Sequence, residues 1–257
     1  MEWREKDGVR WLEACLGAAR VAFGTRLGGT SPAPYDSLNL GLLTADAEAN
    51  VLENRRRLAA ALGFAPERVA YALQVHGADL VLVPPSFRGS FADTGSGKEP
   101  RADGAGLVEA DGQVIGATGV AGLVFTADCL PVAVSGPGGV AMLHCGWRGL
   151  AAGILARGVA AVGAEEAAVG PGIGPCCYEV GTEVLDAFAG LGDGVATGRM
   201  LDLVEAARRL LSAAGVDRVQ SAALCTSCNP ELFFSHRRDE GLTGRQGSLA
   251  WIAGGES

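Results

Sequence analysis

The stretch Val140-Ala-Met-Leu-His-Cys-Gly-Trp-Arg-Gly149 is the part of the chain that indicates the fold most directly. Its first residues form an apolar run typical of a buried strand, and the run ends at His144. A tight turn follows, and an Ala-rich stretch then predicts a helix over about residues 150–162. Proteins of the α/β class bind ligands where strands end and helices begin. Because the turn offers an imidazole, a thiol, a guanidinium and a helix N-terminus that can hold an anion, we expect a functional site there.

Two other segments carry side chains of matching chemistry, Gln74-Val-His-Gly77 and Thr126-Ala-Asp-Cys-Leu-Pro131. The chain has only three histidines, and two of them, His76 and His144, lie within these three segments. We therefore predict that the three segments meet in space around one site.

Composition limits the kind of protein. A net charge of −8 argues against a nucleic-acid partner, since a phosphate backbone requires a basic face. The first seven residues are charged and lack an apolar core, so no signal peptide is expected. The longest apolar stretch, residues 114–125, is too short for a membrane span. We therefore expect a cytoplasmic protein with no membrane partner, in which the seven cysteines favour core, metal-binding or catalytic roles over disulfides.

The order of hairpin-like and strand–helix segments predicts a mixed α/β fold, a single domain over residues 1–257 with a mixed β-sheet core flanked by helices. Residues 1–19 are expected as an N-terminal extension, residues 69–83 as a hairpin with His76 at its tip, and residues 84–104 as a mobile surface loop. The expected helices cover about residues 47–63, 150–162, 181–189 and 202–214, and the expected strands cover residues 21–24, 119–126, 131–135, 140–144, 167–169 and 219–225.

Three features of the helices are specific. Arg55 is expected outside or at the edge of the apolar face of the first helix. Gly158 in the Ala-rich helix fits close packing against a sheet, although glycine weakens a helix by ~1 kcal/mol against alanine. Asp202 is expected to cap the last helix, with Glu205 three residues on.

The first chemical hypothesis is a metal site formed by His76, Cys129 and His144. Imidazole and thiolate ligands suit zinc, and three protein ligands leave a fourth position for water or substrate. The alternative is a buried thiol beside two hydrogen-bonded histidines. A second hypothesis needs no metal: Cys129 or Cys145 acts as a nucleophile with His144 as its base. Because neighbours on a strand point to opposite faces, Cys145 is expected to face the core.

Other candidate residues each have a functional and a structural interpretation. Asp128 could orient a ligand or accept a proton, or it could only bind backbone N–H groups in a turn. Arg148 and Arg26 could each hold an anion, or could be surface residues. Tyr178 lies in a Gly- and Pro-rich loop and offers a stacking surface. Cys225-Thr-Ser-Cys228 has redox-motif spacing, but Asn229-Pro230 follows in place of a helix, so a structural role is favoured.

Many short motifs occur in one order along the chain. They are Thr25-Arg-x-Gly-Gly29, Ser37-Leu-Asn-Leu-Gly41, Asn54-Arg55, Gln74-Val-His-Gly77, Thr126-Ala-Asp-Cys-x-Pro131, His144-Cys-Gly-Trp-Arg-Gly149, Gly174-Pro-Cys-Cys-Tyr-Glu-Val180, Phe233-Phe-Ser-x-Arg-Arg-Asp239 and Thr243-Gly-Arg245. With these motifs the chain resembles the YfiH-like family, also called laccase-domain or multicopper polyphenol oxidase-like proteins, over residues 20–252. It departs from the family pattern at His236, where an aromatic residue is usual, and at Thr44-Ala-Asp46.

The resemblance implies zinc on His76, Cys129 and His144, and it implies phosphorolysis of purine nucleosides (adenosine, inosine, guanosine and S-methyl-5′-thioadenosine), with phosphate as the second substrate. Adenosine deamination is the second implied activity. The oxidase label implies copper and phenols, although a lone His-Cys-His set has too few ligands for a multicopper cluster. Some members are linked to the editing of peptidoglycan precursors.

We accordingly assign catalysis to Asp128 and Arg148, and substrate binding to Arg26, Asn39, Gln74 and Tyr178. In phosphorolysis Arg148 or Arg26 would hold phosphate near the ribose, and in deamination Asp128 would carry the proton. Two alternatives from other classes stay open. A Cys/His hydrolase without metal would lose activity on thiol alkylation but not on chelation, and a nucleotide-binding protein would bind without turnover.

Overall fold

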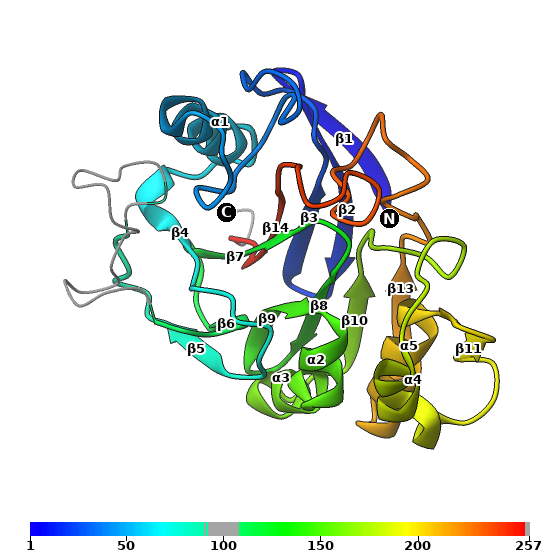
Figure 1. Cartoon of the computed structure of the whole chain (residues 1–257). Helices are drawn as coiled ribbons and strands as arrows, with labels where there is room; N and C mark the ends of the chain where they lie inside the picture. Colours follow the sequence, from blue (N-terminus) through cyan, green and yellow to red (C-terminus); the bar gives the residue numbers. More distant parts are fainter. Residues whose placement is uncertain (90, 92–107, 255–257) are drawn as a thin grey trace.

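The computed structural model describes residues 1–89, 91 and 108–254 of the chain (Figure 1). The loop predicted at 84–104 falls mostly on residues outside these ranges. The first of two large sheets has six strands, and all neighbours in it are antiparallel except the last pair. In spatial order its strands are β1 (Glu2–Lys6), β2 (Val9–Leu16), β3 (Ala19–Gly24), β14 (Gln246–Ile252), β7 (Ala121–Thr126) and β4 (Val69–Ala70).

The second sheet also has six strands and is mixed, with parallel pairs at both of its edges. In spatial order its strands are β13 (Arg218–Ser221), β10 (Glu166–Val169), β8 (Leu130–Gly136), β9 (Gly139–Cys145), β6 (Gly112–Ile115) and β5 (Leu80–Val83). A small ribbon is formed by β11 (Ala196–Thr197) and β12 (Met200–Leu201). The mixed α/β class is thus confirmed, but the core holds two large sheets instead of the single sheet that was predicted.

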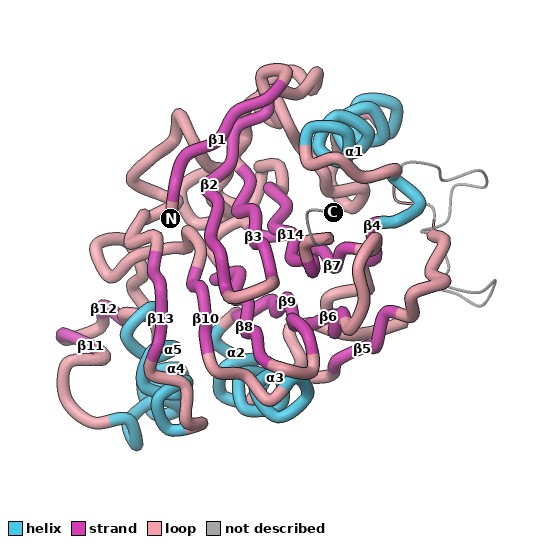
Figure 2. The backbone as a smooth tube through the Cα atoms, turned by 180° about the vertical axis from the view of Figure 1, so that it is seen from behind, coloured by secondary structure: helices cyan, strands magenta, loops and turns pink. Residues whose placement is uncertain are grey.

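Helices cover the outer faces of the two sheets. Figures 1 and 2 show α1 (Glu48–Ala61) beside the first sheet, and the other α-helices together on the far side of the second sheet. These are α2 (Trp147–Ala151), α3 (Ile154–Val162), α4 (Thr182–Phe188) and α5 (Leu203–Ala213), and short 3-10 turns occur at η1 (Pro66–Arg68) and η2 (Ala189–Leu191). Among the described residues no helix is long and apolar enough to cross a membrane.

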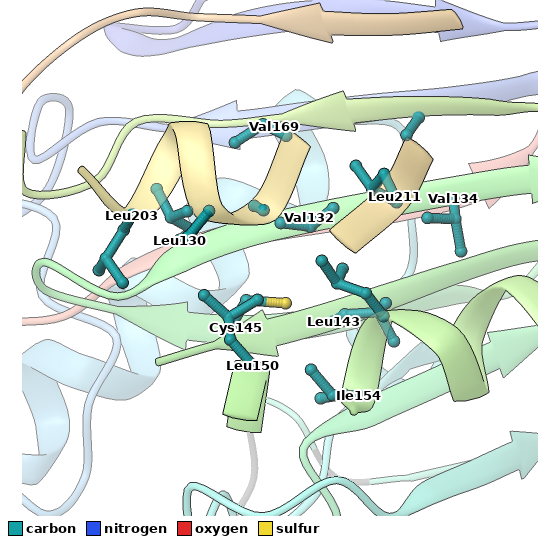
Figure 3. Packing of buried hydrophobic residues seen from close by; sticks show 14 of the residues in the cluster. Leu130, Val132, Val134, Leu143, Cys145, Leu150, Ile154, Val169, Leu203 and Leu211 are labelled. Atoms are coloured by element: carbon teal, nitrogen blue, oxygen red, sulfur yellow. The ribbon is translucent and has the colours of Figure 1, made fainter. Parts of the chain in front are cut away.

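The alternation of side chains along β9 divides the core into layers. Val140 and Met142 belong to the cluster buried between the two sheets, whereas Ala141, Leu143 and Cys145 belong to the cluster between the second sheet and its helices. Figure 3 shows this second cluster, in which side chains of β8 and β9 pack against α2, α3 and α5. His144 follows the parity of Val140 and Met142, so it lies on the face turned towards the first sheet.

Three predicted elements are wrong in their pairing or their bounds. Residues 69–83 do not form a hairpin, because β4 pairs with β7 in the first sheet and β5 pairs with β6 in the second. The single helix predicted at 150–162 is two helices, interrupted at Gly153, whose φ of 85° is left-handed. Residues 1–19 are not an appended extension, since β1 and β2 are strands of the first sheet.

The C-terminal part differs most from the prediction. The strand expected at 219–225 is shorter and lies at an exposed edge, as β13. The last strand is β14, which was not predicted and runs between β3 and β7 near the middle of the first sheet. The position of Arg55 in α1 also differs from the prediction, which placed this residue outside or at the edge of the apolar face. Its side chain is buried, with 1% exposed, and its guanidinium donates to the carbonyls of Leu40 and Phe91.

Candidate active site

Three turns at one end of the sheets bring His76, Cys129 and His144 together, as the sequence predicts. The ligand atoms of these residues all lie within 4.8 Å of one another. The rings of His76 and His144 meet edge to face with their centroids 4.8 Å apart. Cys129 lies in the turn between β7 and β8, and His144 is the penultimate residue of β9.

Asp111, which sequence reasoning missed, organises this cluster. Its buried carboxylate accepts hydrogen bonds from the backbone N–H groups of Val75, His76 and Gly77. These bonds hold the turn in which His76 takes a left-handed φ of 61°. The Oδ1 atom of Asp111 also lies 2.8 Å from Nδ1 of His144, which leaves Nε2 of His144 free to act as a ligand atom. An aspartate just before a strand glycine resembles an ordinary turn residue, so no local signal marked it.

Gly146 allows the three turns to approach closely. A Cβ atom at this position would lie 3.0 Å from Sγ of Cys129 and 3.2 Å from the ring of His76. The glycine of the Cys-Gly-Trp turn is therefore required by the cluster beside it. Cys145 faces the helices and is buried, as predicted, and burial raises the pKa of its thiol well above the ordinary value.

The electrostatics of the cluster favour the anionic form of the thiol. Burial alone would raise the pKa of the Cys129 thiol, but the charge and hydrogen bonds of His144 and His76 lower it to about 6. Burial likewise opposes a charge on His144, yet Cys129 and Asp111 raise the pKa of this imidazole to about 9. A thiolate is the form of cysteine that binds metals and attacks electrophiles.

The donor set fits a metal ion. Two imidazoles and one thiolate, on two turns and on the end of β9, match the ligand types of zinc sites, and a carboxylate behind one imidazole matches their outer-shell support. Three ligands leave one tetrahedral position for a substrate or water.

The cluster lines a cavity of ≈ 460 Å³. Of the candidates named from the sequence, Gln74, Asp128, Arg148 and Tyr178 also line it. Volumes of this size accommodate small organic molecules. The structure thus brings seven of the nine predicted site residues to one place, counting the three cluster residues and these four.

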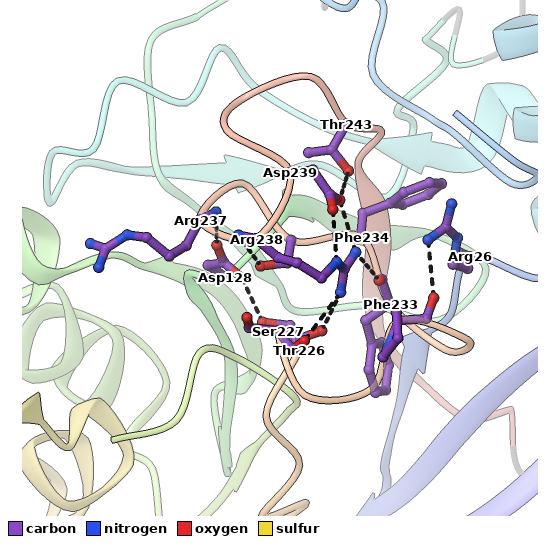
Figure 4. Close-up of polar contacts among 12 residues, drawn as sticks. Arg26, Asp128, Thr226, Ser227, Phe233, Phe234, Arg237, Arg238, Asp239 and Thr243 are labelled. Atoms are coloured by element: carbon purple, nitrogen blue, oxygen red, sulfur yellow. Dashed lines mark hydrogen bonds and ion pairs between the residues drawn. The ribbon is translucent and has the colours of Figure 1, made fainter. Parts of the chain in front are cut away.

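Arg26 and Asn39 are not among the lining residues. The guanidinium of Arg26 donates to the backbone carbonyls of Asp36 and Pro230. It also stacks on the ring of Phe234, and both residues are labelled in Figure 4. Asn39 is fully buried, and its Oδ1 atom accepts hydrogen bonds from the backbone N–H groups of Gly41 and Arg245. Both side chains hold loops around the cavity in shape, so we leave them out of the candidate substrate contacts.

Asp128 is tied into the loops that surround it. Its Oδ1 atom accepts a hydrogen bond of 2.6 Å from the hydroxyl of Thr226, and Oδ2 accepts one of 2.7 Å from the backbone N–H of Arg237 (Figure 4). The residue has a left-handed φ of 94°, which turns the chain just before Cys129. Both carboxylate oxygens are thus engaged in holding the turn.

The polar side chains of the cavity differ in whether they already form hydrogen bonds or ion pairs within the protein. The amide of Gln74 makes both of its hydrogen bonds with the backbone of Phe125. By contrast, the guanidinium of Arg148 forms no ion pair within the described part of the chain and stacks on the ring of Trp147. The hydroxyl of Thr126 is buried without a hydrogen-bond partner among the described residues. Within the described structure, Arg148 is therefore the candidate whose charged group is not already paired.

Further lining residues escaped the sequence reasoning as site residues. Arg245 and Arg237 reach the cavity from the C-terminal loop, Arg55 reaches it from α1, and Phe125 and Trp147 add aromatic surface. Arg237 stacks on Tyr178, and burial raises the pKa of the Tyr178 phenol to about 12. His236, noted as a departure from the family pattern, also lines the cavity.

The fold and the site define a mixed α/β protein with a candidate metal site of two histidines and one cysteine in a cavity rich in arginine and aromatic side chains. The family described as multi-copper polyphenol oxidoreductase laccase matches residues 20–253, and the chain belongs to this family.

Its relatives are similar over nearly their whole length. The chain is 40% identical to purine nucleoside phosphorylase YlmD of Geobacillus stearothermophilus, covering 89% of this chain and 87% of that protein. It is 38% identical to purine nucleoside phosphorylase YfiH of Escherichia coli, covering 98% and 97%. The crystal structure of YlmD from Geobacillus stearothermophilus superposes with a TM-score of 0.84 at 36% identity, covering 98% of both chains. That of a hypothetical protein YfiH from Bacillus licheniformis gives 0.85 at 31% identity, covering 98% and 99%.

Proposed function

We propose that this protein is a zinc-dependent purine nucleoside phosphorylase acting on adenosine, inosine, guanosine and S-methyl-5′-thioadenosine, with adenosine deamination as a second activity. The names of the relatives support phosphorolysis. The observation that carries the proposal is the cavity itself, which joins the His-Cys-His cluster, aromatic surfaces and an Arg148 that has no ion-pair partner among the described residues.

In this proposal His76, Cys129 and His144 hold the zinc ion, and Asp111 fixes the orientation of His144 through its 2.8 Å contact. When bound, zinc supplies a Lewis acid that polarises an oxygen or nitrogen of the substrate. Asp128 acts as a positioning residue for Cys129, because both of its oxygens are engaged by neighbouring loops.

Other residues of the cavity would bind the two substrates, with aromatic side chains for the purine and Arg148 for the phosphate. Trp147, Phe125 and Tyr178 offer flat surfaces on which a purine can stack. Arg148 has a guanidinium without an ion-pair partner in the described structure, and a planar guanidinium binds phosphate through paired N–H donors. Arg148 therefore gives this protein, which has a net charge of −8, a local positive charge that can bind phosphate.

Phosphorolysis in this site is a substitution at the ribose. An oxygen of hydrogen phosphate forms a bond to C1′ as the bond between C1′ and N9 of the purine breaks. The electron pair of that bond leaves with the purine, and the proton of hydrogen phosphate ends on the departing base. The products are the free purine and ribose 1-phosphate, and Arg148 holds the phosphate against C1′ while the base is stacked.

Product analysis tests the proposal. Purified protein is incubated with adenosine in the presence and in the absence of phosphate, beside His76→Ala and the neighbouring exposed-residue control Val75→Ala. We expect adenine and ribose 1-phosphate only with phosphate, and only from the unmodified protein and the control. Inosine formed regardless of phosphate would make deamination the main activity. No product from zinc-loaded protein would refute the nucleoside reaction.

The role of Arg148 has its own test. We expect Arg148→Ala to raise the KM for phosphate at least ~10-fold, with a smaller change in the KM for the nucleoside, because one charge-assisted contact is lost. Arg157→Ala is the matched control, since this exposed arginine of α3 pairs with Asp79 away from the cavity. Equal effects of the two substitutions on phosphate would remove Arg148 from the proposal.

A second candidate is a Cys/His hydrolase acting on a peptidoglycan precursor, and the low pKa of the Cys129 thiol beside His144 favours it. In such an enzyme, alkylation of Cys129 abolishes activity while chelators leave it intact. In the zinc-dependent phosphorylase, chelators abolish activity and zinc restores it. Metal analysis of the active protein also separates zinc from copper, which a phenol oxidase of this family would need.

A further inference from the structure

A second cluster of metal-ligating side chains lies outside the proposed catalytic site. The thiols of Cys176, Cys177, Cys225 and Cys228 all lie within 4.8 Å of one another. The Sγ atom of Cys228 is 3.4 Å from that of Cys176 and 3.4 Å from that of Cys177. The proposed reaction uses none of these four residues.

Backbone hydrogen bonds bring the two cysteine pairs together. The first pair lies in the loop between β10 and α4, and the second in the loop that follows β13. The N–H of Gly172 donates to the carbonyl of Leu224, and the N–H of Thr226 donates to the carbonyl of Gly172. The two loops are thus joined by a short parallel bridge between Gly172 and Cys225, close to both pairs of thiols.

Local geometry turns all four thiols towards one point. The N–H groups of Cys177 and Tyr178 both donate to the carbonyl of Gly174, which closes a tight turn at the adjacent cysteines. The N–H of Gly174 donates to Sγ of Cys225 at 3.2 Å. A Cβ atom at Gly174 would lie 3.2 Å from Cβ of Cys225 and 3.4 Å from Sγ of Cys176, so a glycine allows this approach.

The spacing of the sulfur atoms fits a tetrahedral metal site. Zinc binds thiolates at ~2.3 Å, which places the four sulfurs of a tetrahedral site roughly 3.8 Å apart. The distances here range from 3.4 Å to at most 4.8 Å and so bracket that value. Apolar packing does not explain the cluster, because Cys176 and Cys228 are exposed. The Cys-x2-Cys spacing of Cys225 and Cys228 is also typical of one half of a zinc site.

We propose that Cys176, Cys177, Cys225 and Cys228 hold a structural zinc ion that joins two loops in the wall of the cavity. Tyr178, which lines the cavity, follows Cys177 directly. Thr226, which follows Cys225, donates to Asp128 beside Cys129. The ion therefore fixes both the aromatic wall and the turn that presents Cys129, while all four of its coordination positions are taken by protein.

Metal content is the first test. Zinc per chain is measured on protein purified with zinc, on Cys228→Ser, on His76→Ala, and on Cys15→Ser, which removes an exposed thiol outside both clusters. We expect Cys228→Ser to lose about one zinc ion per chain and Cys15→Ser to lose none. His76→Ala should keep the ion that Cys228→Ser lacks, so this result is independent of the proposed enzyme activity. Equal zinc in Cys228→Ser and the unmodified protein overturns the proposal.

Cobalt in place of zinc reports the ligands directly. His76→Ala loaded with Co²⁺ should show the intense visible bands and the thiolate-to-metal charge transfer of tetrahedral thiolate coordination, and the double variant with Cys228→Ser should not. Disulfide bonds among these four cysteines are the alternative to a metal site. Thiol titration of unmodified protein in denaturant and chelator should find all seven cysteines free, and the loss of four thiols to disulfides overturns the proposal.

If Cys228→Ser does not fold, His76→Ala, in which all four cysteines of the cluster are intact, still decides the question. A mercurial reagent is added to His76→Ala while a chromogenic chelator records the zinc released. Release of about one zinc ion per chain, in step with the modification of the exposed cysteines, supports the site. Modification of the thiols without zinc release overturns it.

Discussion

At the scale of single residues, chemical distinctiveness decided what the sequence could reveal. His76 and His144 are two of only three histidines in the chain, and the structure brings their ligand atoms together with that of Cys129. Arg26 and Asn39 are suitable residue types as well, but their donors and acceptors are engaged by backbone groups. A sequence shows which groups a residue carries and does not show which of them the fold has already used.

Asp111 leads to a prediction about metal affinity. Asp111→Asn should keep the shape of the side chain but weaken its bond with His144, and loss of such an outer-shell partner costs ~10–100-fold in metal affinity. Zinc affinity measured by competition with a chelator tests this. Asp79→Asn, which changes an exposed aspartate just before β5, should leave the affinity unchanged. An unchanged affinity in Asp111→Asn would show that His144 does not need this anchor.

At the scale of elements, local patterns located most helices but did not show how they pack. Gly158 illustrates the reason. It fits close packing, as expected, because a Cβ atom there would lie 2.6 Å from Cδ1 of Leu143 on β9. Gly153, by contrast, takes a left-handed φ and ends one helix before the next begins. Glycine thus allows close packing at position 158 and a left-handed backbone at position 153. Helix propensity alone does not distinguish these two roles.

The start of α5 makes a prediction about pH. Asp202 caps this helix by accepting from the N–H of Glu205, as predicted. Hydrogen bonds from Arg208 and Arg209 lower the pKa of the Glu205 carboxyl to about 2. This value is below the ~4.3 of an unfolded glutamate, so the stabilisation is complete above about pH 4.3 and is lost as the pH falls towards about 2.

Glu205→Gln should therefore lower the free energy of unfolding at pH 7 by roughly 0.5–1 kcal/mol, because partly exposed ion pairs on a helix are screened by water. The difference from the unmodified protein should shrink below pH 4. Urea unfolding at both pH values measures it, and Glu183→Gln, an exposed glutamate in the first turn of α4, is the control. A difference that stayed constant with pH would mean that the ion pairs contribute nothing.

At the scale of the whole molecule, long-range pairing was the part that the sequence could not supply. The apolar run at 69–83 reads as a hairpin, yet its two halves enter different sheets and leave His76 between them. An apolar run shows that a segment is buried, and it carries no information about which strand will pair with it. These strand pairings determine that the core has two sheets, and they also determine where the cavity lies.

Arg55 joins distant parts of the molecule, and its contacts yield a prediction about stability. From α1 its buried guanidinium reaches the carbonyls of Leu40 and Phe91 and lies against aromatic rings. Arg55→Met should lower the free energy of unfolding by roughly 2–4 kcal/mol, because buried carbonyls would lose their donors. Arg56→Met, at the exposed neighbouring position, should change it by less than about 0.5 kcal/mol. Comparable losses in the two variants would contradict this account of Arg55.

The position of β14 has a consequence for how the protein is made. Gln246–Ile252 is synthesised after both β3 and β7, yet β3 and β7 are both paired to it. During translation β3 and β7 therefore each keep one edge without hydrogen-bond partners until β14 has been synthesised. A chain that ends before Gln246 lacks the strand that joins the two halves of the first sheet, so we expect it to fold poorly and to expose two unpaired strand edges.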